Sequence, residues 1–182
     1  MKQIKLIAIF ASLMFLGSKA SAQDTQSDFH TITVVVPNVA LLDLEATTRN
    51  FTSTFVQPTE AGTKLTVPVA NADLWLNYSS IIGGLITSRR VQVKINALVP
   101  GVDIALTAAA ASTGGGTRGT GSTVTLTATD QNLVTGIGSA YTGTGISSGH
   151  NLTYAYTALD ANYGAIRAAS PVVTVTYTLV DN

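Results

Sequence analysis

The chain contains few side chains that could carry out covalent chemistry. It has two histidines, His30 and His150, and no cysteine. A hydrolytic triad needs a histidine close to both a hydroxyl and a carboxylate, and nothing in the spacing brings three such groups together. His30 lies at the edge of an expected first strand, and His150 ends a Gly/Ser-rich stretch, so we expect both at the surface or at a strand edge. We therefore expect no catalytic residues and no enzymatic activity.

Groups for metal or cofactor binding are also sparse. The ten acidic residues are scattered singly, mostly in turns, whereas glycoside hydrolysis needs a pair of carboxyl groups. Residues 160–164 (DANYG) resemble the start of a calcium loop but lack its third oxygen ligand and its later glutamate. The glycine-rich residues 112–122 lack the lysine and the following helix of a phosphate-binding loop. The sequence predicts no metal, no cofactor and a flexible loop at residues 112–122.

Aromatic side chains could instead stack on a sugar ring. Tyr78, Tyr154 and Tyr156 fall on positions that are expected to face inward, where packing explains them better. Trp75 and Tyr141 remain as a candidate ligand platform. A carbohydrate-binding module that uses these two residues is therefore the alternative function.

Short stretches of alternating apolar and polar residues predict the elements that would position these side chains. Such alternation indicates strands with one dry face and one wet face. Threonine, with 27 copies, is the main residue of the wet faces, and its branched Cβ favours a pleated surface. The expected strands cover residues 31–36, 51–55, 65–69, 74–78, 90–97, 104–110, 123–128, 152–158 and 173–179.

About nine short strands favour an all-β fold, a two-layer antiparallel Ig-like β-sandwich. An up-and-down barrel is the competing fold, but the strand spacings are irregular and two connections are long. These connections, residues 112–122 and 136–150, are rich in glycine and are expected to be loops. Neither flanks a change in composition, so residues 23–182 are expected to form a single domain.

Residues 1–22 have the features of a secretory signal peptide. Lys2 and Lys5 precede an apolar run at residues 6–17, and residues 20–22 (ASA) form an A-x-A cleavage site. The run is shorter than the roughly 20 residues that a transmembrane helix needs. We expect cleavage, export to the periplasm, the cell surface or the extracellular space, and no integral membrane span in the processed chain.

The low charge of the chain limits its partners. Charged residues make up 11% of the sequence, and seven basic and ten acidic side chains remain when residues 1–22 are removed. Seven dispersed cations cannot build a basic patch, so we expect no nucleic acid partner.

The segment on which the functional prediction mainly rests follows the predicted cleavage site. Residues 23–29 are polar, and residues 30–36 (HTITVVV) are strongly β-prone. Such a strand normally pairs within its own sheet, but it can also add to the open edge of a neighbouring molecule. Ile32, Val34 and Val36 would then be the alternate apolar plugs of a donor strand.

Three stretches carry a family resemblance: residues 21–23 (SAQ) at the cleavage site, the terminal strand before Pro37, and the Thr/Val/Tyr-rich residues 171–178 (PVVTVTYT). Together they resemble secreted pilin-like and spore-coat-U-like β-sandwich subunits of Gram-negative bacteria, although the spore-coat cysteines are missing. The resemblance implies Ig-like subunits without catalytic residues that polymerise by strand donation or coat the cell surface. We accordingly expect a secreted structural or adhesive protein whose partners are its own copies or other cell-surface components.

Overall fold

The computed structural model describes residues 26–182, so the predicted signal peptide at residues 1–22 lies outside the described residues. The chain divides after Val35 into two units, and the second unit spans Val36–Asn182. In the first unit, the described residues 26–35 form no helix and no strand. The strand expected at residues 31–36 is therefore absent, because its backbone groups have no ladder partner.

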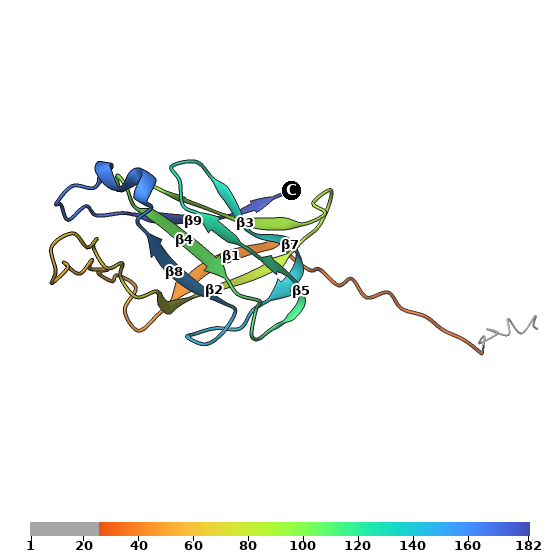
Figure 1. Ribbon diagram of the computed structural model, residues 1–182. Helices are drawn as coiled ribbons and strands as arrows, with labels where there is room; N and C mark the ends of the chain where they lie inside the picture. The colour runs from red at the N-terminus through yellow and green to blue at the C-terminus, as the bar shows by residue number, and fades with distance from the viewer. Residues whose placement is uncertain (1–25) are drawn as a thin grey trace, which may run out of the picture. The chain divides into compact units, whose positions relative to one another are not determined.

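The second unit is all-β, as predicted (Figure 1). Its nine strands pair in antiparallel fashion throughout. Within residues 26–182, η1 (Asp160–Ala165) is the only helical element, and no helix there has the length and apolar character of a membrane span. The strands are β1 (Val39–Glu45), β2 (Asn71–Ile81), β3 (Arg89–Ile95), β4 (Asp103–Ala108), β5 (Gly115–Gly121), β6 (Thr123–Thr125), β7 (Gln131–Tyr141), β8 (His150–Thr157) and β9 (Val175–Asp181).

Hydrogen bonds join all nine strands in one sheet. Its order is β6-β4-β8-β2-β7-β3-β9, with β1 added to β2 and β5 added to β7. Strand β2 is the hub, because its first half pairs with β8 and residues 75–81 pair with the whole of β1. Its last residues also reach β7. Two groups of strands therefore meet on β2.

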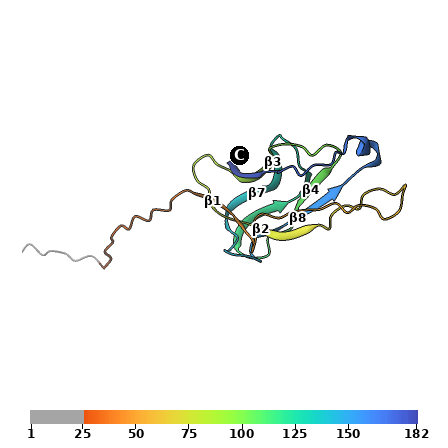
Figure 2. The same cartoon turned by 90° about the vertical axis from the view of Figure 1, so that its left-hand side faces the viewer.

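Side chains from distant strands of this order share one core. Buried residues of β2, β3, β4, β7 and β8 make up this core. The Tyr154 hydroxyl of β8 lies 2.5 Å from the Tyr177 hydroxyl of β9, although β2, β7 and β3 separate these two strands in the order. The sheet therefore curves around its core, and Figure 2 shows β3 on one side of the fold with β2 and β8 on the other.

Alternation predicted several strands together with their buried faces. In β3, Val91, Val93 and Ile95 are buried, while Gln92 and Lys94 are half-buried. This pattern is the one that a strand with one face on the core should produce. The structure also has strands, with shifted ends, where they were expected at residues 74–78, 104–110, 123–128, 152–158 and 173–179.

Two other expected strands do not form. Residues 51–55 and 65–69 lie in the long connection between β1 and β2, and the only pairing described there is an isolated bridge between Val56 and Thr66. Pro58, two residues beyond the bridge, has no N–H to donate to a longer ladder. Apolar alternation in this connection was therefore a misleading signal.

Strand β5 was expected to be a flexible loop, and that expectation is wrong. Its sequence, GGTRGTG, carries almost no apolar side chains, yet it pairs with β7 along most of its length. Gly116 has a φ of 77°, and a Cβ there would lie only 2.1 Å from the Ser139 carbonyl oxygen. The glycines let two backbones approach closely around a register shift between Gly116 and Arg118. The second expected loop, residues 136–150, is also partly wrong, because its first residues belong to β7 and pair with the glycine-rich β5.

Candidate functional site

His150 is fully buried, so the expectation of a surface or edge histidine is wrong. It is the first residue of β8 and pairs with Leu76 of β2. The preceding Gly149 has a φ of 70°, and a Cβ there would lie 2.3 Å from the Leu76 carbonyl oxygen. Glycine thus lets the chain enter β8 close against β2, with the imidazole in the interior. His30, by contrast, is exposed.

The His150 ring is held by neutral groups. Its Nδ1 lies 2.7 Å from the Ala109 carbonyl oxygen, so Nδ1 carries the proton and donates it. Its Nε2 lies 2.9 Å from the Tyr78 hydroxyl, which also contacts the Arg118 carbonyl oxygen. Burial lowers the pKa of His150 and raises the pKa of Tyr78. Within residues 26–182 no carboxylate hydrogen-bonds to this pair, so the pair forms a packed polar cluster without the geometry of a triad.

The three predicted plug residues are solvent-exposed. Ile32, Val34 and Val36 are 76%, 80% and 69% exposed, and the neighbouring Phe29 and Val35 are exposed as well. All five lie in extended chain that belongs to no strand. Exposed runs of apolar side chains of this length are uncommon on the surfaces of monomeric soluble proteins.

Strands β1 and β9 each have one unpaired edge. Among residues 26–182, β1 pairs only with β2, and β9 pairs only with β3. The side chains that these two strands direct at the core are only partly buried, unlike those of β2 and β3. The part of the core beneath β1 and β9 is therefore incompletely covered. These half-covered side chains are Leu42, Leu44, Val175, Tyr177 and Leu179.

Trp75 lines a cleft on the outer face of β2. The cleft has a volume of about 270 Å³ and draws on three segments: the connection after β1, the start of β2 and the loop between β7 and β8. Sequence reasoning found Trp75 but missed its neighbours, which lie up to 100 residues apart and share no motif. The other lining residues are Thr47, Thr48, Asn50, Phe51, Ala72, Asp73, Ile146 and Ser147.

Tyr141 does not belong to this cleft. It ends β7 and pairs with Ser79, which lies four residues beyond Trp75 along β2. At about 3.3 Å per residue, that separates the two positions by about 13 Å. Tyr141 is 60% exposed, so the two aromatic residues of the predicted platform occupy separate places on the surface.

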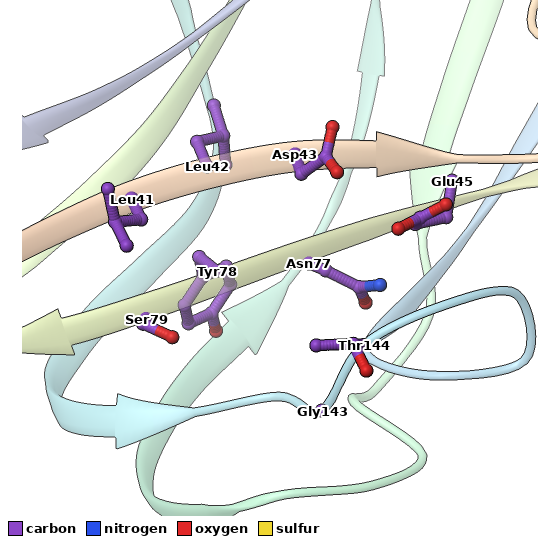
Figure 3. Close-up of a pocket in the computed structure, with 9 residues that line it drawn as sticks. All are labelled: Leu41, Leu42, Asp43, Glu45, Asn77, Tyr78, Ser79, Gly143 and Thr144. Atoms are coloured by element: carbon purple, nitrogen blue, oxygen red, sulfur yellow. The ribbon is translucent and has the colours of Figure 1, made fainter.

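A smaller cleft of about 130 Å³ lies beside the first, between β1, β2 and the loop after β7 (Figure 3). Asp43 and Glu45 extend from β1 on its rim, but Asp43 already pairs with Arg49 at 3.1 Å. Asn77 on its floor donates from Nδ2 to the Gly145 carbonyl oxygen at 3.0 Å, which fixes the loop over β2. Throughout the described chain, no group of three or more acidic or histidine side chains could hold a metal ion.

Comparison with protein-family models, with curated proteins and with solved structures finds no match to this chain.

Proposed function

We propose that the protein is an exported, non-enzymatic structural or adhesive subunit of the cell surface, which assembles by donating residues 30–36 to the sheet of a neighbouring copy. In this proposal the strands form a two-layer Ig-like sandwich. One layer holds β6, β4, β8, β2 and β1, and the other holds β5, β7, β3 and β9. The resemblance to pilin-like and spore-coat-U-like subunits supports the same mechanism.

The observation that carries the proposal is the exposed apolar segment. Ile32, Val34 and Val36 are spaced two residues apart, so in a strand they would share one face. Added to a sheet edge, that strand would bury three branched side chains and form main-chain hydrogen bonds at the same time. Burying one such side chain stabilises by about 1.5–3 kcal/mol, so three contribute roughly 4.5–9 kcal/mol toward the cost of association, and the main-chain hydrogen bonds add to this.

The receiving edge is best sought on β1 or β9. Each has unpaired backbone groups along one side, and each strand leaves core side chains half covered. β1 and β9 both have seven residues, which matches the length of residues 30–36. A donor strand here would complete both the hydrogen-bond ladder and the cover of the core.

Donation to another molecule is favoured over folding back onto the same chain. A return of residues 30–36 onto β1, which begins at Val39, leaves only Pro37 and Asn38 to make the turn. The usual two-residue hairpin turns need a positive φ at their first residue, whereas the proline ring fixes φ at about −65°. Pro37 therefore opposes the tight turn that self-pairing needs.

The test places one charge on the apolar face of the segment. We expect wild-type residues 23–182 to form oligomers at high concentration in size-exclusion chromatography and fibres in electron microscopy. Val34→Asp should abolish both, because an unpaired carboxylate would have to be buried in the receiving sheet. Thr33→Asp is the matched control, since it adds the same charge at the adjacent position on the opposite face and should leave assembly intact.

Two results from the assembly measurements would contradict the proposal. One is a wild-type protein that stays monomeric at high concentration. The other is equal behaviour of Val34→Asp and Thr33→Asp, which would mean that the segment does not bind as a strand with one buried face. A peptide of residues 26–37 should also bind a variant that lacks these residues, and failure of that peptide to bind would argue against a receiving edge.

A further inference from the structure

We propose that the cleft lined by Trp75 binds a neutral saccharide. This site is independent of strand donation, because its lining residues all lie outside residues 30–36. A sugar ring presents an apolar face of C–H groups and a rim of hydroxyls, so its binding site needs an aromatic surface beside several neutral donors and acceptors. The cleft contains both.

The aromatic part of the site is Trp75, supported by Phe51. Trp75 is only partly buried, and Phe51 is 37% exposed. Phe51 is itself fixed, since its ring packs edge-on against Tyr154 with centroids 5.3 Å apart. Two aromatic residues from separate segments therefore border the same opening, and one of them is anchored to the core.

A β-bulge sets the position of this part of β2. The pairing of β2 with β8 shifts register between Asn71 and Leu74, so the strand carries an irregularity at the rim of the cleft. The Asn151 side chain holds it in place by donating from Nδ2 to the carbonyl oxygens of Ala72 and Leu74, at 2.8 and 3.3 Å. Bulges are common next to binding sites. Asp73 and Trp75 share the outer face of β2 by ordinary alternation, and Ala72, at the irregularity, lines the same cleft.

The polar lining is mostly neutral and free to bind a ligand. Across residues 26–182, the side chains of Thr47, Thr48, Asn50 and Ser147 form no hydrogen bond within the protein. Ser147 is the one described residue other than glycine with a positive φ, 68°, and its carbonyl oxygen accepts a hydrogen bond from Ser112 Oγ at 3.0 Å. The loop is thus held in a strained shape at the edge of the cleft.

The charge of the lining selects among ligand classes. No lysine or arginine lines the cleft, which disfavours anionic ligands. Asp73 is its only carboxylate, and the Asp73 Oδ2 atom already accepts a hydrogen bond from Asn71 Nδ2 at 3.0 Å. Hydroxyl and amide groups therefore outnumber charges, and that composition fits a polyhydroxylated neutral ligand better than a cation.

Trp75 is the only tryptophan in the sequence, so its fluorescence reports directly on this cleft. We expect millimolar concentrations of at least one neutral oligosaccharide in a panel of maltotetraose, cellotetraose, triacetylchitotriose and lacto-N-tetraose to shift the emission in a saturable way. Tetramethylammonium is the parallel cationic probe. Excitation should be at a wavelength that tyrosine does not absorb.

Variants then locate the binding site. The double variant Thr48→Ala/Asn50→Ala alters exposed loop residues that the fold does not use, and it should weaken saccharide binding about tenfold, the effect of losing one or two hydrogen bonds. Trp75→Ala, measured by calorimetry, should abolish binding. Tyr141→Ala removes an exposed aromatic residue outside the cleft and should leave affinity unchanged.

Several outcomes would overturn the proposal. These are the absence of a fluorescence response to every saccharide in the panel, a response to tetramethylammonium alone, and a saccharide affinity that falls with Tyr141→Ala but not with the double variant. The double variant leaves the aromatic residues and the core intact. It therefore still tests the proposed site if Trp75→Ala fails to fold. A failed result here would leave strand donation untouched.

Discussion

Arg89 is the most heavily bonded buried charge in the described chain. Its side chain is 2% exposed, and its Nε donates to Asp181 Oδ1 at 2.6 Å. Its Nη2 donates to Asn38 Oδ1 at 2.6 Å, and its Nη1 donates to the Val39 carbonyl oxygen and to Ser80 Oγ. One guanidinium therefore ties the start of β1 and the ends of β2 and β9 together.

Replacing this guanidinium should be costly. We expect Arg89→Met to lower the free energy of unfolding by about 3 kcal/mol, because several buried acceptors lose their donor. The figure is at the low end for a buried pair, since Asp181 is half exposed and water can solvate it. Urea denaturation measures the change, with the exposed Arg167→Met as a control expected to stay within about 0.5 kcal/mol. Equal effects of the two substitutions would refute the role assigned to Arg89.

We expect the stability of the protein to depend on pH through His150. Burial lowers its pKa in the folded protein from the ordinary value of 6.5, so the folded state binds a proton less readily than the unfolded state. Above about pH 6.5 the ring is neutral in both states and stability is complete. As the pH falls below that value, the unfolded state takes up a proton first and stability decreases, by at most about 1.4 kcal/mol per pH unit.

Thermal melts between pH 7.5 and pH 5 test this expectation. Wild-type protein should lose more stability over this range than His150→Gln, which has no imidazole to protonate. His30→Gln changes an exposed histidine and should behave like the wild type. A pH profile of His150→Gln parallel to that of the wild type would show that the buried ring does not control the acid response.

At the scale of elements, β5 depends on glycine for its place in the sheet. Gly116→Ala should destabilise the protein by about 2 kcal/mol or more, because its φ is 77° and a Cβ would collide with the Ser139 carbonyl oxygen. Gly164→Ala is the matched control, since η1 offers open space there. Chemical denaturation of both variants measures the difference. If both variants unfold at the wild-type denaturant concentration, close backbone approach is not what requires glycine in β5.

Which elements the sequence predicts depends on how each one is stabilised. β3 was predictable because Val91, Val93 and Ile95 face one core and leave a clear alternation. β5 was not, because its pairing rests on backbone contact and glycine leaves no periodic signal. Residues 31–36 and 65–69 alternate equally well but form no strand. Alternation shows that a segment could form a strand with one buried face. Whether the strand forms depends on a pairing partner elsewhere in the chain.

The candidate site was likewise only partly predictable from the sequence. Trp75 stands out by residue type, as the single tryptophan on an expected strand. Its partners Asn50, Asp73 and Ser147 reach the cleft through a bulge and two loops, and loop geometry of this kind has no periodic signature. The burial of His150 was missed for a related reason, since a close approach of two strands decides it.

At the scale of the whole molecule, the sheet leaves several borders open. In the described chain, β1, β5, β6 and β9 each pair with a single strand. Natural proteins usually protect such edges with charge, proline or bulges, and this chain has only 11% charged residues. The proposed assembly would use one of these edges as the receiver of residues 30–36, and the comparison of Val34→Asp with Thr33→Asp tests that use.

The way β1 begins has a mechanical consequence. Tension applied to the chain at Val36 would reach the sheet at Val39, where the Arg89 guanidinium donates a hydrogen bond to the backbone. Beyond that point β1 is bonded to β2 along seven residue pairs, so a pull along the strand axis would load those bonds together in shear. In subunits linked through this segment, the hydrogen bonds between β1 and β2 would therefore resist stretching before the force reached the other strands of the core.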